Sequence, residues 1–380
     1  MMITVSSVST NRQAFAGPLS TQPLIGVAAE YASNPELAAS NPRSETHGAL
    51  LVDLPVNYDV DDVHISLIPR VRYGGAAGYS AVTSNYYHLD ASAQFANELG
   101  SLSFTGALYR DSSLLYAGEL ANGIGVRRDT SAEEVNWQRS LTERAQVQLD
   151  VSTARTLYAQ NTGSTNLVDY RYSSVSPSFA YSVSERDTLR VLGGASRYNS
   201  LNHLTSSDSV NVQLGFDRRL SEPWTLTTAA GYSKSTDRYR YFFGNIDSTQ
   251  KGVLYSVNLV RQAESLTVSA TASRALAPTG FAFVSRQDNV KALANYNSSE
   301  RWTFGAGITW SNITDPLIAG GSTQRRFYSG DLSAIWHWTE QWMLTFHVTK
   351  IGQKIQQPSI NATSNGVSLE ISRQFHRTNQ

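Results

Sequence analysis

Hydrophobic and polar residues alternate along most of this chain, in runs that come in pairs separated by short turns. In the clearest pair, residues 332–348, apolar side chains occupy every second position on both sides of Thr339-Glu340-Gln341. Successive side chains of a β-strand point to opposite faces, so a period of two gives each strand one apolar and one polar face. The segment therefore predicts a β-hairpin with one continuous apolar face.

The same hairpin unit recurs from one end of the chain to the other. Eight short turns are marked by Asp61-Asp62, Asn97-Glu98, Thr142-Glu143, Ser184-Glu185, Ser221-Glu222, Glu264-Ser265, Ser299-Glu300 and Thr339-Glu340. Their spacing of about 40 residues indicates a repeat architecture that forms one continuous domain. Each repeat holds two runs of about ten residues, whereas a propeller blade needs four shorter strands, so a propeller fits poorly.

About eighteen strands of roughly 9 to 11 residues can be counted, the length that a tilted transmembrane β-strand requires. The connections that alternate with the short turns are polar and about 10 to 20 residues long, as on the outer side of bacterial barrels. Closure leaves no strand edge in lipid. We predict an all-β fold: a transmembrane antiparallel up-and-down β-barrel of about 18 strands, with short periplasmic turns and long extracellular loops.

The predicted barrel spans residues 23–375 and is a single domain. Residues 1–22 are expected to form a flexible N-terminal arm whose signal peptide is missing or removed, and residues 376–380 a C-terminal tail. Pro55 and Pro69 lie inside predicted strands and suggest bulges there. Tryptophans on the apolar parity near short turns indicate a membrane-interface girdle rather than a carbohydrate site: Trp137, Trp224, Trp302, Trp338 and Trp342.

Composition narrows the functional classes. Lys+Arg and Asp+Glu balance at 31 each without a basic cluster, which argues against a nucleic-acid partner. The chain has no cysteine, so disulfides and thiolate metal sites are excluded. Its seven histidines are scattered, and no HExxH, GxSxG or phosphate-binding loop occurs. We predict no enzyme, no catalytic residue, no metal site and no cofactor.

A barrel of eighteen strands is wide enough for an aqueous lumen. On the polar parity, the pore-lining candidates are Arg70, Arg72, His88, Asp90, Glu134, Asp150, Arg190, Asp217, Arg219, Lys291, Asp331, His347 and Glu370, with Asp53, His64 and His337 beside them. Both signs of charge are present, so strong ion selectivity is not expected. Arg70 and Arg72 are candidates for contact with an anionic polymer, and Tyr86, Tyr109 and Tyr172 for stacking on sugars. Alternatively, opposite charges pair across neighbouring strands and the polar residues only face water.

Several motifs carry a resemblance to a known family. They are the Ser/Thr-Glu-Arg turns within LTERAQVQL and VSERDTLRVLGGASRY, the run from Arg110 to Leu114 followed by Glu119-Leu120, and Tyr31 with Asn34-Pro35. In this order and spacing, over about residues 25–375, the chain resembles the β-barrel porin type 2 family of Gram-negative outer-membrane proteins, some of which accompany exopolysaccharide synthesis and export.

The resemblance implies a pore in the lipid of the outer membrane. The leading function is the exit for a secreted exopolysaccharide, in concert with a periplasmic polysaccharide export protein. The alternatives are a general or solute-specific diffusion porin and a surface barrel that serves as an adhesin or anchor. Phe375, at the end of the last strand, resembles the signal read by the barrel assembly machinery. Residues 112–131 and 235–250 are gate candidates by length alone.

Overall fold

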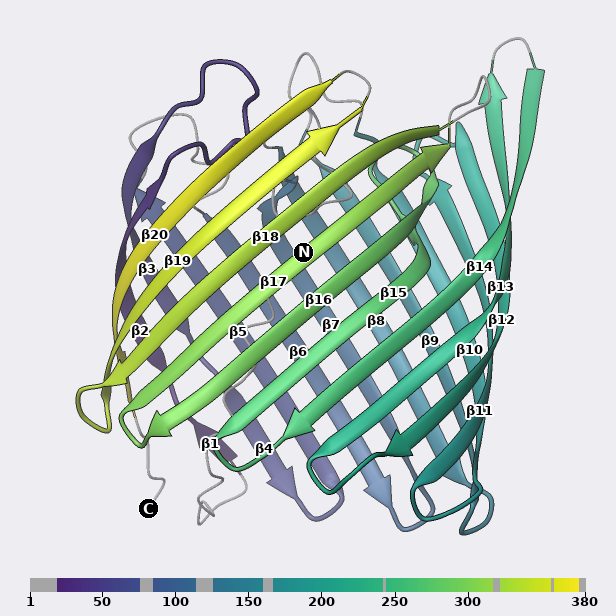
Figure 1. Cartoon of the computed structure of the whole chain (residues 1–380), viewed down its shortest axis with the longest axis horizontal. Helices are drawn as coiled ribbons and strands as arrows, with labels where there is room; N and C mark the ends of the chain where they lie inside the picture. Colours follow the sequence, from purple (N-terminus) through teal and green to yellow (C-terminus); the bar gives the residue numbers. More distant parts are fainter. Residues whose placement is uncertain are drawn as a thin grey trace.

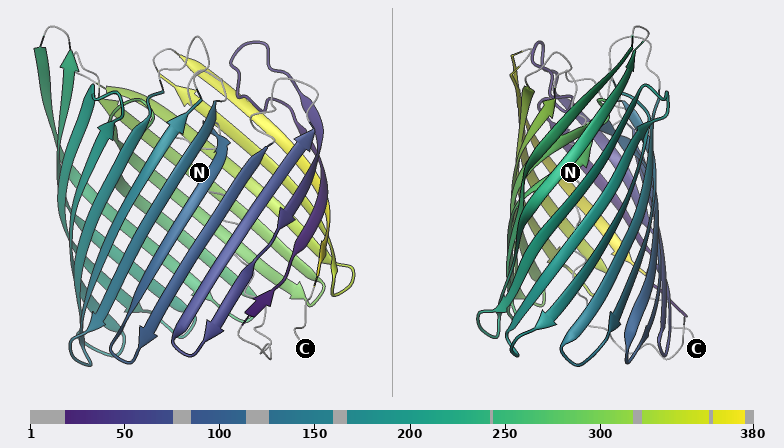
Figure 2. Two further views of the ribbon diagram at one scale, coloured as in Figure 1. Left: turned by 180° about the vertical axis from the view of Figure 1, so that it is seen from behind. Right: turned by 90° about the vertical axis from the view of Figure 1, so that its right-hand side faces the viewer.

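The computed structural model describes residues 19–75, 85–113, 126–159, 167–241, 244–316, 322–356 and 359–375. Its strands pair only with antiparallel neighbours, and the sheet closes on itself because β2 pairs with both β3 and β20. Figures 1 and 2 show a barrel of tilted strands that is wider in one direction than in the other. The strands are Leu19–Thr21 (β1), Leu24–Ala32 (β2), Glu45–Asp53 (β3), Val56–Val60 (β4), Val63–Gly75 (β5), Tyr86–Asn97 (β6), Gly100–Ser112 (β7), Arg127–Ser140 (β8), Ala145–Tyr158 (β9), Tyr170–Ser182 (β10), Asp187–Ser200 (β11), Thr205–Arg219 (β12), Trp224–Tyr241 (β13), Gly244–Gln262 (β14), Leu266–Pro278 (β15), Val284–Ser299 (β16), Trp302–Pro316 (β17), Ser322–His337 (β18), Trp342–Ile355 (β19) and Ile360–Gln374 (β20).

Two prolines divide what are otherwise continuous barrel strands. β3 and β4 both run along β5 and are interrupted at Leu54-Pro55. β1 and β2 are interrupted at Gln22-Pro23 in the same way. Proline cannot donate to the ladder, so the pairing stops at these points. Merging each pair of segments gives a closed antiparallel barrel of 18 strands, which confirms the predicted fold. Pro69 stays within β5, where its carbonyl oxygen accepts a hydrogen bond from the Leu54 N–H at 3.0 Å.

The outer wall of the barrel is apolar and the inner wall is polar. In β12, Val210, Val212 and Leu214 are 55%, 57% and 68% exposed, whereas Asn211 and Gln213 between them are partly buried. In a transmembrane barrel the exposed apolar face meets lipid and the alternate face lines the lumen. Large apolar side chains repeat this exposed pattern around the barrel, so the period of two in the sequence correctly identified the two walls.

The Ser/Thr-Glu pairs recur because their hydroxyl groups stabilise the tight turns. Thr142 Oγ1 accepts hydrogen bonds from the backbone N–H groups of Arg144 and Ala145 at 3.2 and 3.0 Å. Ser184 and Thr339 accept two backbone N–H groups in the same way. These donors point away from the strand ladder and would otherwise depend on water. All eight short turns lie where the repeat predicts them.

The strands are longer, and the extracellular connections shorter, than the sequence pattern predicts. β13 and β14 contain 18 and 19 residues and include residues 235–241 and 244–250, which the sequence pattern places in a long connection and gate candidate. This hairpin projects past its neighbours at the upper right of Figure 1. Beyond the lipid the outer face need not be apolar, so the period-two signal fades while the hydrogen-bonded ladder continues. Most of the other gate candidate, residues 114–125, lies outside the described residues.

The N-terminal boundary also differs from the prediction. Leu19–Thr21, expected in the flexible arm, form β1, which pairs with β4 so that Leu19 lies opposite Tyr58. Residues 1–18 and the predicted tail 376–380 lie outside the described residues. Phe375 ends the described barrel, where its N–H donates to the Pro23 carbonyl oxygen at 2.8 Å. Within the described ranges, no helix is both long and apolar enough to cross a membrane.

The assignment of the two walls predicts a difference between neighbouring positions of β12. Leu214→Arg places a charge on the lipid-facing wall and should lower the free energy of unfolding by about 2–4 kcal/mol. Gln213→Arg, one residue away, faces the lumen and should cost much less. Denaturant unfolding of each variant in lipid vesicles, monitored by the heat-dependent shift in gel mobility, measures the two losses of unfolding free energy. Equal losses at the two positions would contradict the assignment.

Candidate functional site: the barrel lumen

All thirteen predicted pore-lining residues occupy inward-facing positions of the barrel wall. Their strands are distributed around most of the circumference, so they do not converge on one point. The structure brings together two groups. Arg70, Arg72, His88 and Asp90 lie on the adjacent strands β5 and β6, and an ion pair joins β11 to β12 through Arg190 and Asp217 at 2.9 Å.

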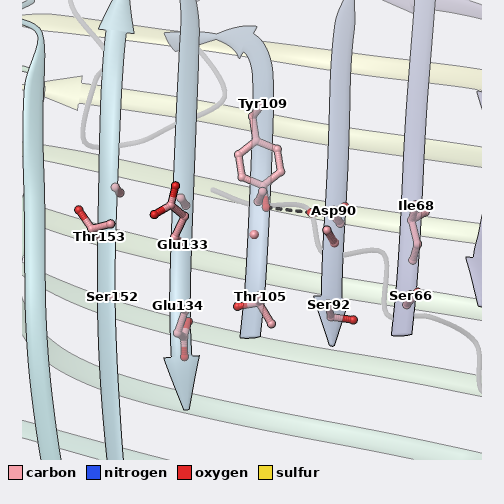
Figure 3. A pocket seen from close by; sticks show the side chains of 15 residues that line it. Ser66, Ile68, Asp90, Ser92, Thr105, Tyr109, Glu133, Glu134, Ser152 and Thr153 are labelled. Carbon is pink, nitrogen blue, oxygen red and sulfur yellow. Dashed lines mark hydrogen bonds between the residues drawn. The ribbon is translucent and has the colours of Figure 1, made fainter. Parts of the chain in front are cut away.

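Arg70 and Asp90 form the centre of a hydrogen-bonded cluster on β5–β7. Arg70 Nη1 donates to Asp90 Oδ2 at 2.9 Å, and the Tyr109 hydroxyl donates to Asp90 Oδ1 at 3.0 Å (Figure 3). Arg70 Nε also lies 3.8 Å from a carboxylate oxygen of Asp53. Both carboxylate oxygens of Asp90 are therefore engaged, and the wall itself fixes the direction of the Arg70 guanidinium.

Arg72 is held by a second group of side chains from neighbouring strands. Its guanidinium pairs with Glu30 of β2, whose carboxylate lies 3.0 Å from His47 Nε2. The same guanidinium lies 5.8 Å from the ring centre of Tyr86, which stacks on His88 at 4.8 Å. Arg70 and Arg72 are thus ion-paired within the wall, as in the alternative in which opposite charges pair across strands.

A recess of about 470 Å³ lies on the inner wall across β5–β9. Its floor consists of small side chains, including Ser66, Ser92 and Thr105, while Tyr109 and Glu134 stand at its edges (Figure 3). Glu134 is exposed and forms no ion pair with any described residue. The recess therefore combines room for a solute with a hydroxyl group and a carboxylate that can contact it.

Acidic side chains outnumber basic ones on the inner wall of the described strands. Thirteen are acidic: Glu30, Glu45, Asp53, Asp59, Asp90, Asp111, Glu134, Asp150, Asp217, Asp237, Asp315, Asp331 and Glu370. Seven are basic: Arg70, Arg72, Arg128, Arg190, Arg219, Lys291 and Arg325. The expectation of no strong ion selectivity rested on a more balanced set and is replaced by that of a negatively charged lumen.

Six of these acids were missed at the level of sequence: Glu30, Glu45, Asp59, Asp111, Asp237 and Asp315. Most lie near strand ends or in segments that the alternating pattern places in the long connections. Asp237, for example, continues the inward register of Ser233 and Ser235, where it receives a hydrogen bond from Gln250 Nε2 at 2.8 Å. Extending the period-two register past the apolar band would have found it.

The connection between β15 and β16, residues 279–283, folds into the barrel. Thr279 is fully buried, and its carbonyl oxygen lies 3.5 Å from the hydroxyl of Tyr198 on β11. The Gly280 carbonyl oxygen accepts a hydrogen bond from the Val168 N–H, next to β10, at 2.7 Å. β10 and β11 are not neighbours of β15 or β16 in the sheet, so these contacts span the lumen near its extracellular end.

Apolar side chains close around this crossing. Tyr198 packs with the buried residues Val126, Tyr158, Tyr170 and Val284, and the rings of Tyr170 and Tyr198 stack at 5.3 Å. These buried side chains exclude water, so the polar lumen is narrower where the connection crosses it. The inward-folded connection and its tyrosine cluster, which we call the mouth cluster, were not predicted from the sequence.

A second connection also packs inward, near the place where the first and last strands of the barrel meet. Leu37, between β2 and β3, is buried against Phe327 of β18 and Ala362 of β20. Its carbonyl oxygen accepts a hydrogen bond from Gln353 Nε2 at 2.9 Å. Two extracellular connections, neither of them a predicted gate, therefore pack onto the inner wall.

Comparison with known proteins bears on the fold. No protein-family model and no curated protein matches the chain. The chain is similar to the unliganded ferric citrate transporter FecA, with 9% identity and a TM-score of 0.51 over 95% of this chain and 79% of that one. It also aligns with two Pseudomonas aeruginosa structures. OccK2 (OpdF) is 8% identical with a TM-score of 0.47, and the alignment covers 96% of this chain and 100% of that one. The outer membrane protein OpdK is 12% identical with a TM-score of 0.47, and the alignment covers 93% of this chain and 98% of that one.

At this level of identity, the similarity to FecA supports the fold alone. The porin-like barrel that the family resemblance implies is present. Membership in the β-barrel porin type 2 family stays a prediction, because no family model matches. Among the described residues, no group of three or more His, Asp or Glu side chains is arranged to hold a metal ion.

Proposed function

We propose that this protein is an outer-membrane channel for hydrophilic solutes. The observation that carries the proposal is the polar, negatively charged inner wall enclosed by an apolar outer wall. An adhesin or anchor would not require a charged recess inside the barrel. The barrel has no energy source of its own, so cargo would move down its gradient or be driven by a partner.

The finer proposal concerns the cargo, and its leading form is a secreted exopolysaccharide. It is supported by the family resemblance and by groups on the inner wall that suit sugars, namely the recess with Tyr109 and Glu134. The acidic wall favours a neutral or cationic glycan over a polyanion, because a polyanion would be repelled. A solute-specific porin is the second candidate, favoured by the mouth cluster, which narrows the path available to a polymer.

Single-channel recording of the refolded protein in a planar bilayer tests both levels of the proposal. A channel gives a steady conductance. Block by the host's purified exopolysaccharide, but not by unrelated glycans, would support polymer export. A conductance indifferent to every glycan would favour the porin, and the absence of conductance in the mouth-opened variant described below would contradict the channel proposal itself.

A further inference from the structure

The outer wall carries a group of exposed cations at the extracellular margin of its apolar band. We call them the basic patch; they come from five strands and are Arg155 (β9), Arg171 (β10), Arg197 (β11), Lys234 and Arg238 (β13), and Lys251 (β14). Asp208 on β12 and Asp247 on β14 are acidic residues at outward positions among these cations, and Asp129 and Glu133 lie at outward positions of β8 beside Arg155. Positive charge therefore predominates on a surface that the proposed channel does not use.

Two pairs of like charges face each other directly across the strands. Arg155 is the ladder partner of Arg171, and Lys234 is the ladder partner of Lys251. Like charges directly opposite one another destabilise an antiparallel ladder. None of these four side chains forms an ion pair with a described residue. Such an arrangement calls for anions from outside the chain.

The remaining two cations of the basic patch provide a contrast. Arg197 Nε lies 2.7 Å from Asp208 Oδ1, and Arg238 Nη1 lies 2.9 Å from Asp208 Oδ2. A single carboxylate is thus shared by both arginines, and the chain neutralises part of the patch itself. The positive charge that is left over is concentrated at the two like-charged pairs.

The position of the patch identifies what can reach it. Lys234 and Lys251 occupy the next outward position beyond the lipid-facing Tyr232 and Val253, which are 50% and 54% exposed. The short turns lie at the other end of these strands, so the cations stand at the outer leaflet. Long basic side chains just beyond an apolar band extend to the level of the lipid headgroups.

We propose that the basic patch binds the phosphate groups of lipid headgroups in the outer leaflet. Arginine guanidinium groups suit bidentate bonds to phosphate, and lysines attract it as point charges. β11 and β12 separate the two like-charged pairs, so each pair would hold its own phosphate. Because the patch lies outside the lumen, this inference does not depend on the proposed channel function.

The test compares the full-length protein with a variant in which both pairs are neutralised by Arg155→Gln, Arg171→Gln, Lys234→Gln and Lys251→Gln. A control for loss of outward charge elsewhere, Arg139→Gln with Arg218→Gln, removes two exposed outward cations near the short turns. Each protein is placed in nanodiscs of phosphatidylcholine, alone or with phosphatidic acid. Native mass spectrometry after mild extraction measures retained phosphatidic acid, and thermal unfolding measures stability.

We expect the unaltered protein and the control to retain phosphatidic acid and to unfold at a higher temperature in its presence. The neutralised variant should retain about ten-fold less and lose the increase in unfolding temperature. In pure phosphatidylcholine it should be at least as stable as the unaltered protein, because the repulsion within the pairs is gone. Equal retention by all three proteins, or an equal stabilisation by inorganic phosphate in phosphatidylcholine discs, would overturn the proposal.

Discussion

Replacing Tyr198 with alanine is expected to open the extracellular mouth and raise the single-channel conductance. Tyr198 is fully buried, stacks on Tyr170, and contacts the carbonyl of Thr279 in the connection that crosses the lumen. Removing a buried aromatic ring costs about 3–5 kcal/mol where the site cannot collapse. This free energy is lost from the contact between residues 279–283 and β11. The connection should therefore detach from β11 while the hydrogen bonds between the strands stay intact.

Tyr198→Phe is the matched control, because it keeps the ring and removes only the hydroxyl group, whose contact at 3.5 Å is at the limit of a hydrogen bond. Its conductance should stay close to that of the unaltered protein. Amide hydrogen exchange at residues 279–283 gives a second readout, which should rise in the alanine variant alone. If both variants conduct like the unaltered protein, the mouth cluster does not limit the passage of ions.

Cation selectivity is the second large expected effect. Thirteen acidic and seven basic side chains face the lumen on the described strands, so potassium should permeate more readily than chloride. In a planar bilayer with a KCl gradient, the zero-current potential should have the sign set by the cation. The preference should weaken as salt is raised, because screening shortens the reach of the wall charges.

The carboxylates that carry this preference are those without a paired cation. Glu134 and Asp331 face inward and form no ion pair with a described residue, so Glu134→Gln with Asp331→Asn should lower the potassium-to-chloride permeability ratio roughly two-fold. Glu133→Gln is a sharp control, because the same charge is removed one residue away on the outward-facing parity. An anion-preferring channel, or equal effects of Glu133→Gln and Glu134→Gln, would contradict a selectivity set by the inner wall.

The ion pairs of the inner wall also change the role that we expect of Arg70 and Arg72. The sequence suggested two inward cations that an anionic polymer could contact. Asp53 and Asp90 surround Arg70, and Glu30 pairs with Arg72. We expect these arginines to order the wall and to leave the unpaired carboxylates, rather than the guanidinium groups, as the charges that a solute meets.

The sequence by itself determined the fold and the two walls of the barrel. A strict period of two makes one face of each strand apolar, and Ser or Thr at the short turns satisfies the turn's own N–H groups, as Thr142 does. Both effects are local, since they depend on residues within a few positions of one another. Strand number, the eight short turns and the inward side of Glu134 or Asp217 could therefore be predicted from the chain alone.

Only the tertiary structure decided where strands end and which distant side chains meet. Outside the lipid no apolar face is required, so the pattern could not show that β13 and β14 include residues 235–241 and 244–250. Closure of the barrel places Glu30 beside Arg72, and the fold brings residues 279–283 against Tyr198. These contacts join positions far apart in the chain and leave no local signature, because their energy comes from packing and charge pairing across the lumen wall.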